Sequence, residues 1–209
     1  MVGCARFPAV AICAQRSWEE GHVKALFEML AAYNAWANER LYDAVARVPD
    51  RDYRADRGAF FGSLHGTLNH LLLGDRILMH RFTGEGDEPT QLDAILYDAF
   101  ADLRAARRAE DARIIAYIGA LTEAELAGAL RYRSTRNPAD IEQRLAPLLL
   151  HFFNHQTHHR GQAHCLLTGL AGEAPSLDLL VFQRQSGVSL LSGQGGVCLA
   201  PERCPSRIR

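Results

Sequence analysis

Hydrophobic residues recur at helical spacing along most of this chain and predict four long amphipathic helices. In the first of them, apolar side chains continue at intervals of three and four residues from Val23 to Val45. The pattern stops at Pro49, which a helix interior does not tolerate. Ser17 followed by Glu20 forms a capping-box pattern, so we expect this helix to begin at Ser17.

Capping residues place the next two helices. Ser63 is a candidate N-cap for a helix that runs to about Phe82, where Thr83-Gly84 follows. Thr90 opens a third, arginine-rich helix that extends to about Ala120. A further short helical turn is expected after Thr122.

The fourth helix is predicted from Ala146 to Gly169, because Pro147 is tolerated at the first helical position. Residues 130–144 connect it to the preceding helix, in a form that the pattern leaves open. The strongest strand signal is the short apolar run 179–182, which turn residues precede. Four long amphipathic helices around one core predict an all-α fold, a four-helix bundle.

The two ends of the chain differ from its middle. Residues 1–16 and 186–209 lack periodicity and contain glycine, proline and isolated cysteines, so we expect both to be poorly ordered extensions. Residues 17–185 then form a single domain, which suits a chain of 209 residues. The five cysteines are scattered and form no C-x-x-C pair, which is typical of a reducing cytoplasm.

Charge and hydropathy exclude two classes of partner. A formal net charge of −1 gives no general attraction to nucleic acid or to an anionic membrane. The arginines of the third predicted helix alternate with acidic residues, as on a solvated face. No apolar run approaches the roughly 20 residues of a membrane helix. We therefore expect no nucleic-acid partner and no membrane partner.

Candidate chemistry is concentrated in the fourth predicted helix, which carries five of the nine histidines of the chain. His151, His155, His158 and His159 crowd one arc of about 100° around its axis, whereas His164 points elsewhere. Two histidines one helical turn apart offer two imidazoles to a single zinc or nickel ion. Spacing leaves three pairs open, namely 151/155, 155/159 and 151/158.

A third ligand should come from a neighbouring helix, and the helix after Ser63 offers His65, His70 and His80. His65 and His70 differ by about 140° in phase, so only one of them can face the interior. His70 lies in the most apolar stretch of this helix, where an imidazole needs either a metal or a hydrogen-bond partner.

Two asparagines stand on the apolar stripe of the first predicted helix. Asn34 and Asn38 share a face with leucine and phenylalanine side chains. Buried amides must be hydrogen-bonded. They therefore either bond to each other and to the backbone, or border a polar pocket.

Several of these stretches resemble the DinB-like (YfiT-like) family. The most specific is N-H-x-x-x-H-R-G-Q at residues 154–162, and the likeness extends over about residues 22–184. The other matching stretches are 33–38, 64–70 and 175–182. The resemblance implies an up-down-down-up four-helix bundle that pairs as a homodimer.

The resemblance also implies a metal triad, with one histidine on the second helix and an H-x-x-x-H pair on the last. These positions are His70, His155 and His159 in this chain, which leaves His151 and His158 as neighbours. Three histidine ligands leave a coordination position open, as in catalytic rather than structural sites.

Relatives of known activity include thiol transferases that use bacillithiol or mycothiol and a maleylpyruvate isomerase. The resemblance therefore implies a metal-dependent enzyme that acts on a small molecule through metal-activated water or thiol, as a hydrolase or a thiol S-transferase. The cofactor would be a divalent ion, zinc or nickel, joined by a low-molecular-weight thiol if the reaction is a thiol transfer. The alternative is a non-catalytic, stress-induced dimer that binds a metal or a ligand.

Overall fold

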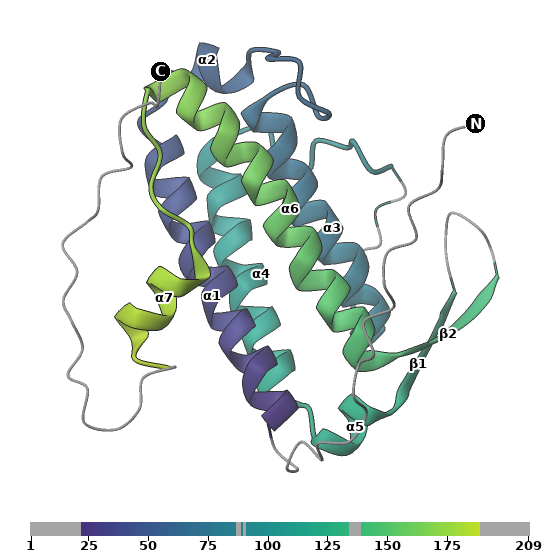
Figure 1. The fold of residues 1–209 in the computed structure, drawn as a ribbon. Helices are drawn as coiled ribbons and strands as arrows, with labels where there is room; N and C mark the ends of the chain where they lie inside the picture. Colours follow the sequence, from purple (N-terminus) through teal and green to yellow (C-terminus); the bar gives the residue numbers. More distant parts are fainter. Residues whose placement is uncertain (1–21, 87–88, 90, 134–138, 189–209) are drawn as a thin grey trace, which may run out of the picture.

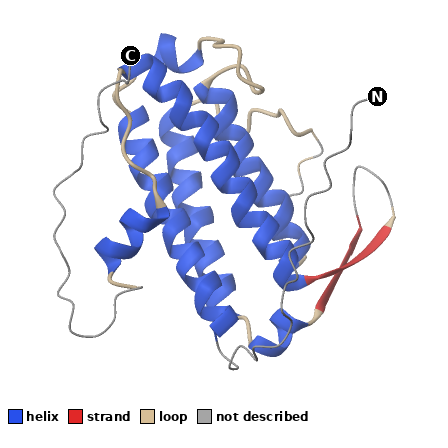
Figure 2. Ribbon diagram, in the orientation of Figure 1, coloured by secondary structure: helices blue, strands red, loops and turns tan. Residues whose placement is uncertain are grey.

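The described part of the chain is mainly helical, with one small two-stranded sheet (Figures 1 and 2). This computed structural model describes residues 22–86, 89, 91–133 and 139–188. The long helices are α1 (His22–Val45), α3 (Leu64–Thr83), α4 (Phe100–Ala120) and α6 (Leu145–Ala171). The shorter elements are α2 (Asp50–Arg54), α5 (Glu123–Ala127), α7 (Leu179–Ser186), β1 (Ala129–Arg133) and β2 (Asp140–Arg144).

The four long helices pack against one another around a shared interior. Both α1 and α3 contact α4 and α6, so each apolar stripe finds a partner (Figure 1). One apolar cluster includes Phe27, Phe82 and Phe152, and a second includes Leu41 and Leu103. The prediction of an all-α fold, in the sense of a mainly helical one, is therefore confirmed. Within the described residues, no helix has the length and apolarity needed to cross a membrane.

The caps predicted for α3 and α5 are confirmed. The Ser63 side chain accepts a hydrogen bond from the amide of Gly66 at 3.1 Å, and Gly84 ends α3 in the left-handed conformation. Thr122 and Glu125 form a complete capping box at α5. The capping box proposed at Ser17 and the extension 1–16 lie outside the described residues, as does most of the C-terminal extension.

The third predicted helix begins later than the sequence pattern indicated. Helix α4 starts at Phe100, Thr90 lies outside the described residues, and residues 91–99 form an irregular segment. The Asn69 side chain accepts from the Tyr97 amide at 3.0 Å and donates to the Tyr97 carbonyl oxygen at 3.2 Å. These bonds to α3 replace the helical bonds of Tyr97, so the segment lies against α3 instead of continuing α4.

The described residues of the connection over residues 130–144 lie mainly in two β-strands. Strands β1 and β2 pair antiparallel, with Ala129 opposite Arg144 and Arg133 opposite Asp140. The end of β2 leads directly into α6, whose first residue is Leu145, one position before the predicted start.

The strand signal at residues 179–182 is wrong, because this run forms helix α7. Asp178 caps the helix by accepting from the Leu180 amide at 2.8 Å. Phe182 then packs between Tyr33 and Trp36 of α1. A short apolar run fits either element, and here the cap and the aromatic contacts favour the helix.

A buried ion pair links α3 to α4 in the interior of the protein. Arg107 donates to a carboxylate oxygen of Asp75 at 2.5 Å and lies 2.9 Å from an oxygen of Asp111. Burial raises the pKa of Asp75 to about 7, although the guanidinium of Arg107 acts in the opposite direction. Gln156 of α6 also donates to Asp75 and, at 3.3 Å, to the carbonyl oxygen of Leu71.

The two asparagines on α1 join the same polar interior. Asn34 and Asn38 both donate to Asp111, at 3.2 Å and 3.0 Å, and both accept from Arg160 of α6. Neither amide bonds to the other, so the hypothesis of a mutual asparagine pair is wrong. We call the seven residues that connect the four long helices in this way the polar network: Asn34, Asn38, Asp75, Arg107, Asp111, Gln156 and Arg160.

Replacing Asp75 tests the polar network. Asp75→Leu leaves Arg107 buried with one carboxylate fewer, so we expect a loss of about 3–5 kcal/mol in the free energy of unfolding. The double substitution Asp75→Leu/Arg107→Met also removes the unpaired charge, and should recover part of this loss but not all of it, because Asp111 then loses Arg107. Urea unfolding of the metal-free protein measures the effect, with Asp102→Leu on the exposed face of α4 as control. Equal free energies of unfolding for the Asp75→Leu and Asp102→Leu variants would contradict the role of Asp75 as a buried partner of Arg107.

Candidate metal centre

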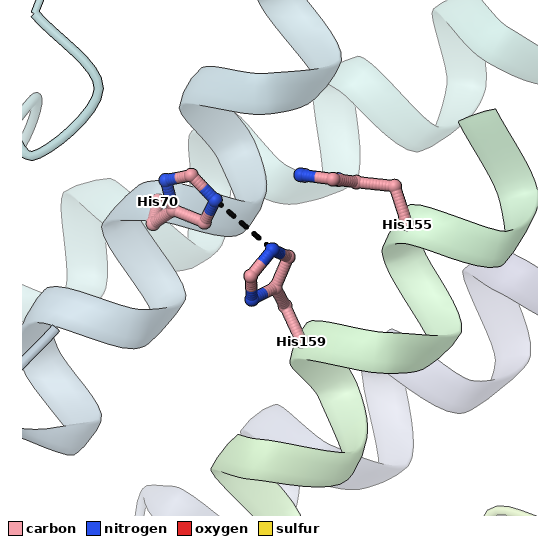
Figure 3. A group of neighbouring side chains, drawn as sticks. All are labelled: His70, His155 and His159. Carbon is pink, nitrogen blue, oxygen red and sulfur yellow. Dashed lines mark hydrogen bonds between the residues drawn. The ribbon is translucent and has the colours of Figure 1, made fainter. Parts of the chain in front are cut away.

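Three imidazoles from two helices converge on one point. His70 comes from α3, whereas His155 and His159 come from successive turns of α6 (Figure 3). One ring nitrogen of each lies within 4.8 Å of the others. Nε2 of His70 and Nε2 of His159 are 3.2 Å apart. These distances suit three ligands of a single ion.

A glycine on α3 makes room for this convergence. A Cβ atom at Gly74 would lie 2.7 Å from Cε1 of His155, which is closer than nonbonded carbon atoms approach. Glycine in a helix interior is unfavourable by roughly 0.5–1 kcal/mol relative to alanine. The imidazole of His155 therefore uses space that α3 provides at a cost in helix stability.

Hydrogen bonds to the outer nitrogens set the tautomers of two rings. Nδ1 of His70 lies 2.8 Å from the carbonyl oxygen of Leu92, which can only accept, so Nδ1 carries the proton. Nδ1 of His159 lies 2.8 Å from Oε1 of Gln162 and is the donor there for the same reason. Each neutral ring then presents the lone pair of Nε2, and the two lone pairs face each other. A shared cation would relieve this repulsion.

The third ring has an unsatisfied nitrogen. Nδ1 of His155 is buried and has no hydrogen-bond partner in the described structure. Burial, followed by the neighbouring His159 and His70, lowers the pKa of His155 to about 3. Burial also lowers the pKa of His70 and of His159. All three rings therefore stay neutral near pH 7, which is the form that binds metal ions.

An aromatic ring covers one side of the histidine group. Phe61, just before α3, stacks on His70 with ring centroids 3.7 Å apart and an interplanar angle of 19°. Phe61 also makes a T-shaped contact with His159, at 5.5 Å between centroids. A Cβ at Gly66 would lie 2.1 Å from the Phe61 carbonyl oxygen, so Gly66 permits this approach.

The sequence pattern missed both Phe61 and Leu92, because each lies in an irregular segment whose path periodicity does not predict. One signal was available for the environment of the site. Two glycines, Gly66 and Gly74, occur within a predicted helix, where glycine usually has a packing reason.

The remaining histidines of α3 have backbone partners. Nε2 of His65 lies 3.1 Å from the Tyr97 carbonyl oxygen, and Nδ1 of His80 lies 2.8 Å from that of Gly86. His65 and His70 are both buried, but they face different elements, as their phase difference predicts: His65 packs on Tyr53 of α2, whereas His70 faces the histidines of α6. The irregular segment 91–99 provides the polar partners that allow both to be buried.

The other histidines of α6 lie around the group. His151 and His158 are exposed, with ring centroids 6.0 Å from His155 and 4.8 Å from His159 respectively. His164 bonds to the carbonyl oxygen of Pro175 at 3.0 Å. Among the described residues, one histidine group has the spacing for a metal ion, and it contains His70, His155 and His159.

Comparison with known proteins places the three histidines within a region shared with one protein family. Protein DinB of Bacillus subtilis (strain 168) is 25% identical to this chain over 168 residues, which cover 75% of the chain and 94% of that protein. The model of the DinB family matches residues 22–189, a span that includes all three histidines and the four long helices. The chain therefore belongs to the DinB family.

Proposed function

We propose that this protein is a metal-dependent enzyme that binds one divalent ion, zinc or nickel, through His70, His155 and His159. The observation that carries the proposal is the pair of facing Nε2 lone pairs, 3.2 Å apart, with a ring nitrogen of His155 within 4.8 Å of the other two histidines. Imidazole nitrogens suit zinc and nickel better than magnesium or calcium, which prefer oxygen ligands.

Three protein ligands leave room for a substrate or a water molecule at the ion. A bound divalent ion supplies Lewis acidity and lowers the pKa of a coordinated water or thiol, which provides a nucleophile near neutral pH. The protein's own contribution is orientation: Leu92 and Gln162 hold the outer nitrogens of two ligands, and Phe61 excludes water from one face of His70. The substrate would be a small molecule, and the reaction a hydrolysis or a thiol transfer.

A second candidate function is binding of a metal or ligand without catalysis. It is favoured by the composition of the group, which consists of histidines alone in the described part of the chain. The nearby buried carboxylate of Asp75 is engaged by Arg107 and Gln156, so it is unavailable as a general base. Metal analysis of the purified protein, followed by a screen of thiol cofactors with electrophiles, distinguishes the two functions.

We also infer the finer topology of an up-down-down-up four-helix bundle. The supporting observation is that α1 and α6 run towards the end of the molecule where α2 lies, whereas α3 and α4 run away from it (Figure 1). The irregular segment after α3 makes the return that two successive parallel helices require. A homodimer, which the family resemblance implies, is part of the same proposal.

Single alanine substitutions distinguish ligands from neighbours. His70→Ala, His155→Ala and His159→Ala should each lose most of the zinc and nickel affinity, because each removes a coordinate bond. His151→Ala should weaken binding by at most about 10- to 100-fold, the effect of altering a group that orients a ligand. His158→Ala should do less. Isothermal titration measures all five variants. If His151→Ala abolishes binding while His159→Ala retains it, the ligands are instead His70, His151 and His155.

Gly74→Ala tests the geometry without removing a ligand. The new Cβ displaces the His155 ring, so zinc affinity should fall by about 10- to 100-fold, as when a group that orients a metal ligand is altered. Helix stability should not fall, since alanine is favoured over glycine in helices. Gly119→Ala on α4 is the control, because a Cβ there meets nothing within 4 Å. Unchanged zinc affinity in Gly74→Ala, measured by the same titration, would mean that His155 is not a ligand in this position.

A further inference from the structure

Residues 57–63 form a tight turn immediately before α3, which we call the aromatic turn. The Arg57 amide donates to the Gly62 carbonyl oxygen, and the Gly62 amide donates to that of Ala59, both at 2.8 Å. Gly58 and Gly62 each have a φ of 72°, a conformation that favours glycine. The turn is therefore held by its own backbone bonds.

The aromatic turn presents two neighbouring phenylalanines to different surroundings. Phe61 packs on His70, as described above, whereas the side chain of Phe60 is 85% exposed. Their ring centroids are 4.9 Å apart with an interplanar angle of 75°, an edge-to-face arrangement. Phe61 thus covers the histidine group, and Phe60 continues this aromatic surface into solvent.

This exposure distinguishes Phe60 from the other apolar side chains at the surface. Isolated exposed apolar residues are ordinary in proteins. The other exposed large apolar residues in the described structure are less exposed, with exposed fractions from 44% for Ile115 to 59% for Leu150. Phe60 is more exposed than these, is fixed on an ordered turn, and adjoins a ring that contacts two of the three converging histidines.

We propose that Phe60 is a specificity-determining residue that contacts the substrate, and that the substrate carries an aromatic group next to the atom that binds the metal. This inference rests on the proposed function. A substrate ring beside Phe60 would lie within the 4.5–7 Å that aromatic pairs prefer and would cover the exposed face. Because Phe60 contacts Phe61 and Phe61 stacks on His70, the metal-binding atom of the same molecule would be close to the histidine group.

Two hydroxamates provide the test, because they share one chelating group and differ only in the presence of a ring. The zinc affinity of each variant is measured first, and benzohydroxamate and acetohydroxamate are then titrated into the zinc-loaded protein. We expect the wild-type protein to bind benzohydroxamate at least about 10-fold more tightly, which corresponds to about 1.4 kcal/mol. Phe60→Ser should remove most of this preference while leaving the affinities for zinc and acetohydroxamate within about twofold.

Two control variants accompany Phe60→Ser. Phe60→Tyr retains the ring and should retain the preference, whereas Leu180→Ser removes an exposed apolar side chain from α7 and should change nothing. An unchanged preference in Phe60→Ser overturns the inference. The inference is also overturned if the zinc-loaded protein binds neither hydroxamate, but that result would leave the proposed zinc site intact. Failure to bind zinc at all appears in the first titration and overturns the proposed function, and the inference with it.

Discussion

The position of the histidine group depends on the buried hydrogen bonds from Gln156 of α6 to Asp75 and to the Leu71 carbonyl oxygen of α3. His155 directly precedes Gln156, and His70 directly precedes Leu71. The register that satisfies the amide of Gln156 is therefore the register that brings the imidazoles together. A slip of one helical turn, about 5.4 Å, would break both the amide bonds and the convergence of the rings.

The polar network extends this constraint to the whole fold. Arg107 joins Asp75 to α4, and the two asparagines of α1 bridge Asp111 and Arg160. Buried charges contribute little net stability compared with apolar side chains of similar volume, but an unpaired buried charge is strongly destabilising. The apolar clusters supply the gain from burial, and the polar network penalises packings in which the helices are displaced. We regard this specificity as the role of the network.

Helical periodicity predicted the long helices and the crowding of histidines, because both follow from the angular spacing of residues along one helix. It could not choose between His151 and His159 as the partner of His155, since that choice depends on how α6 faces α3. The family resemblance selected the set that the structure brings together. Phe61 and Leu92 escaped prediction because irregular segments have no period. Run 179–182 was misassigned because its aromatic contacts come from α1, far away in sequence.

X-ray absorption at the zinc edge of the zinc-loaded protein tests the central claim most directly, because it reports the ligands without any substitution. If the register of α3 and α6 positions His70, His155 and His159 around one ion, the spectrum will show three imidazole nitrogens at about 2.0–2.1 Å and a further light-atom ligand. Two imidazoles or fewer, or sulfur at about 2.3 Å, would contradict the account and place the metal elsewhere.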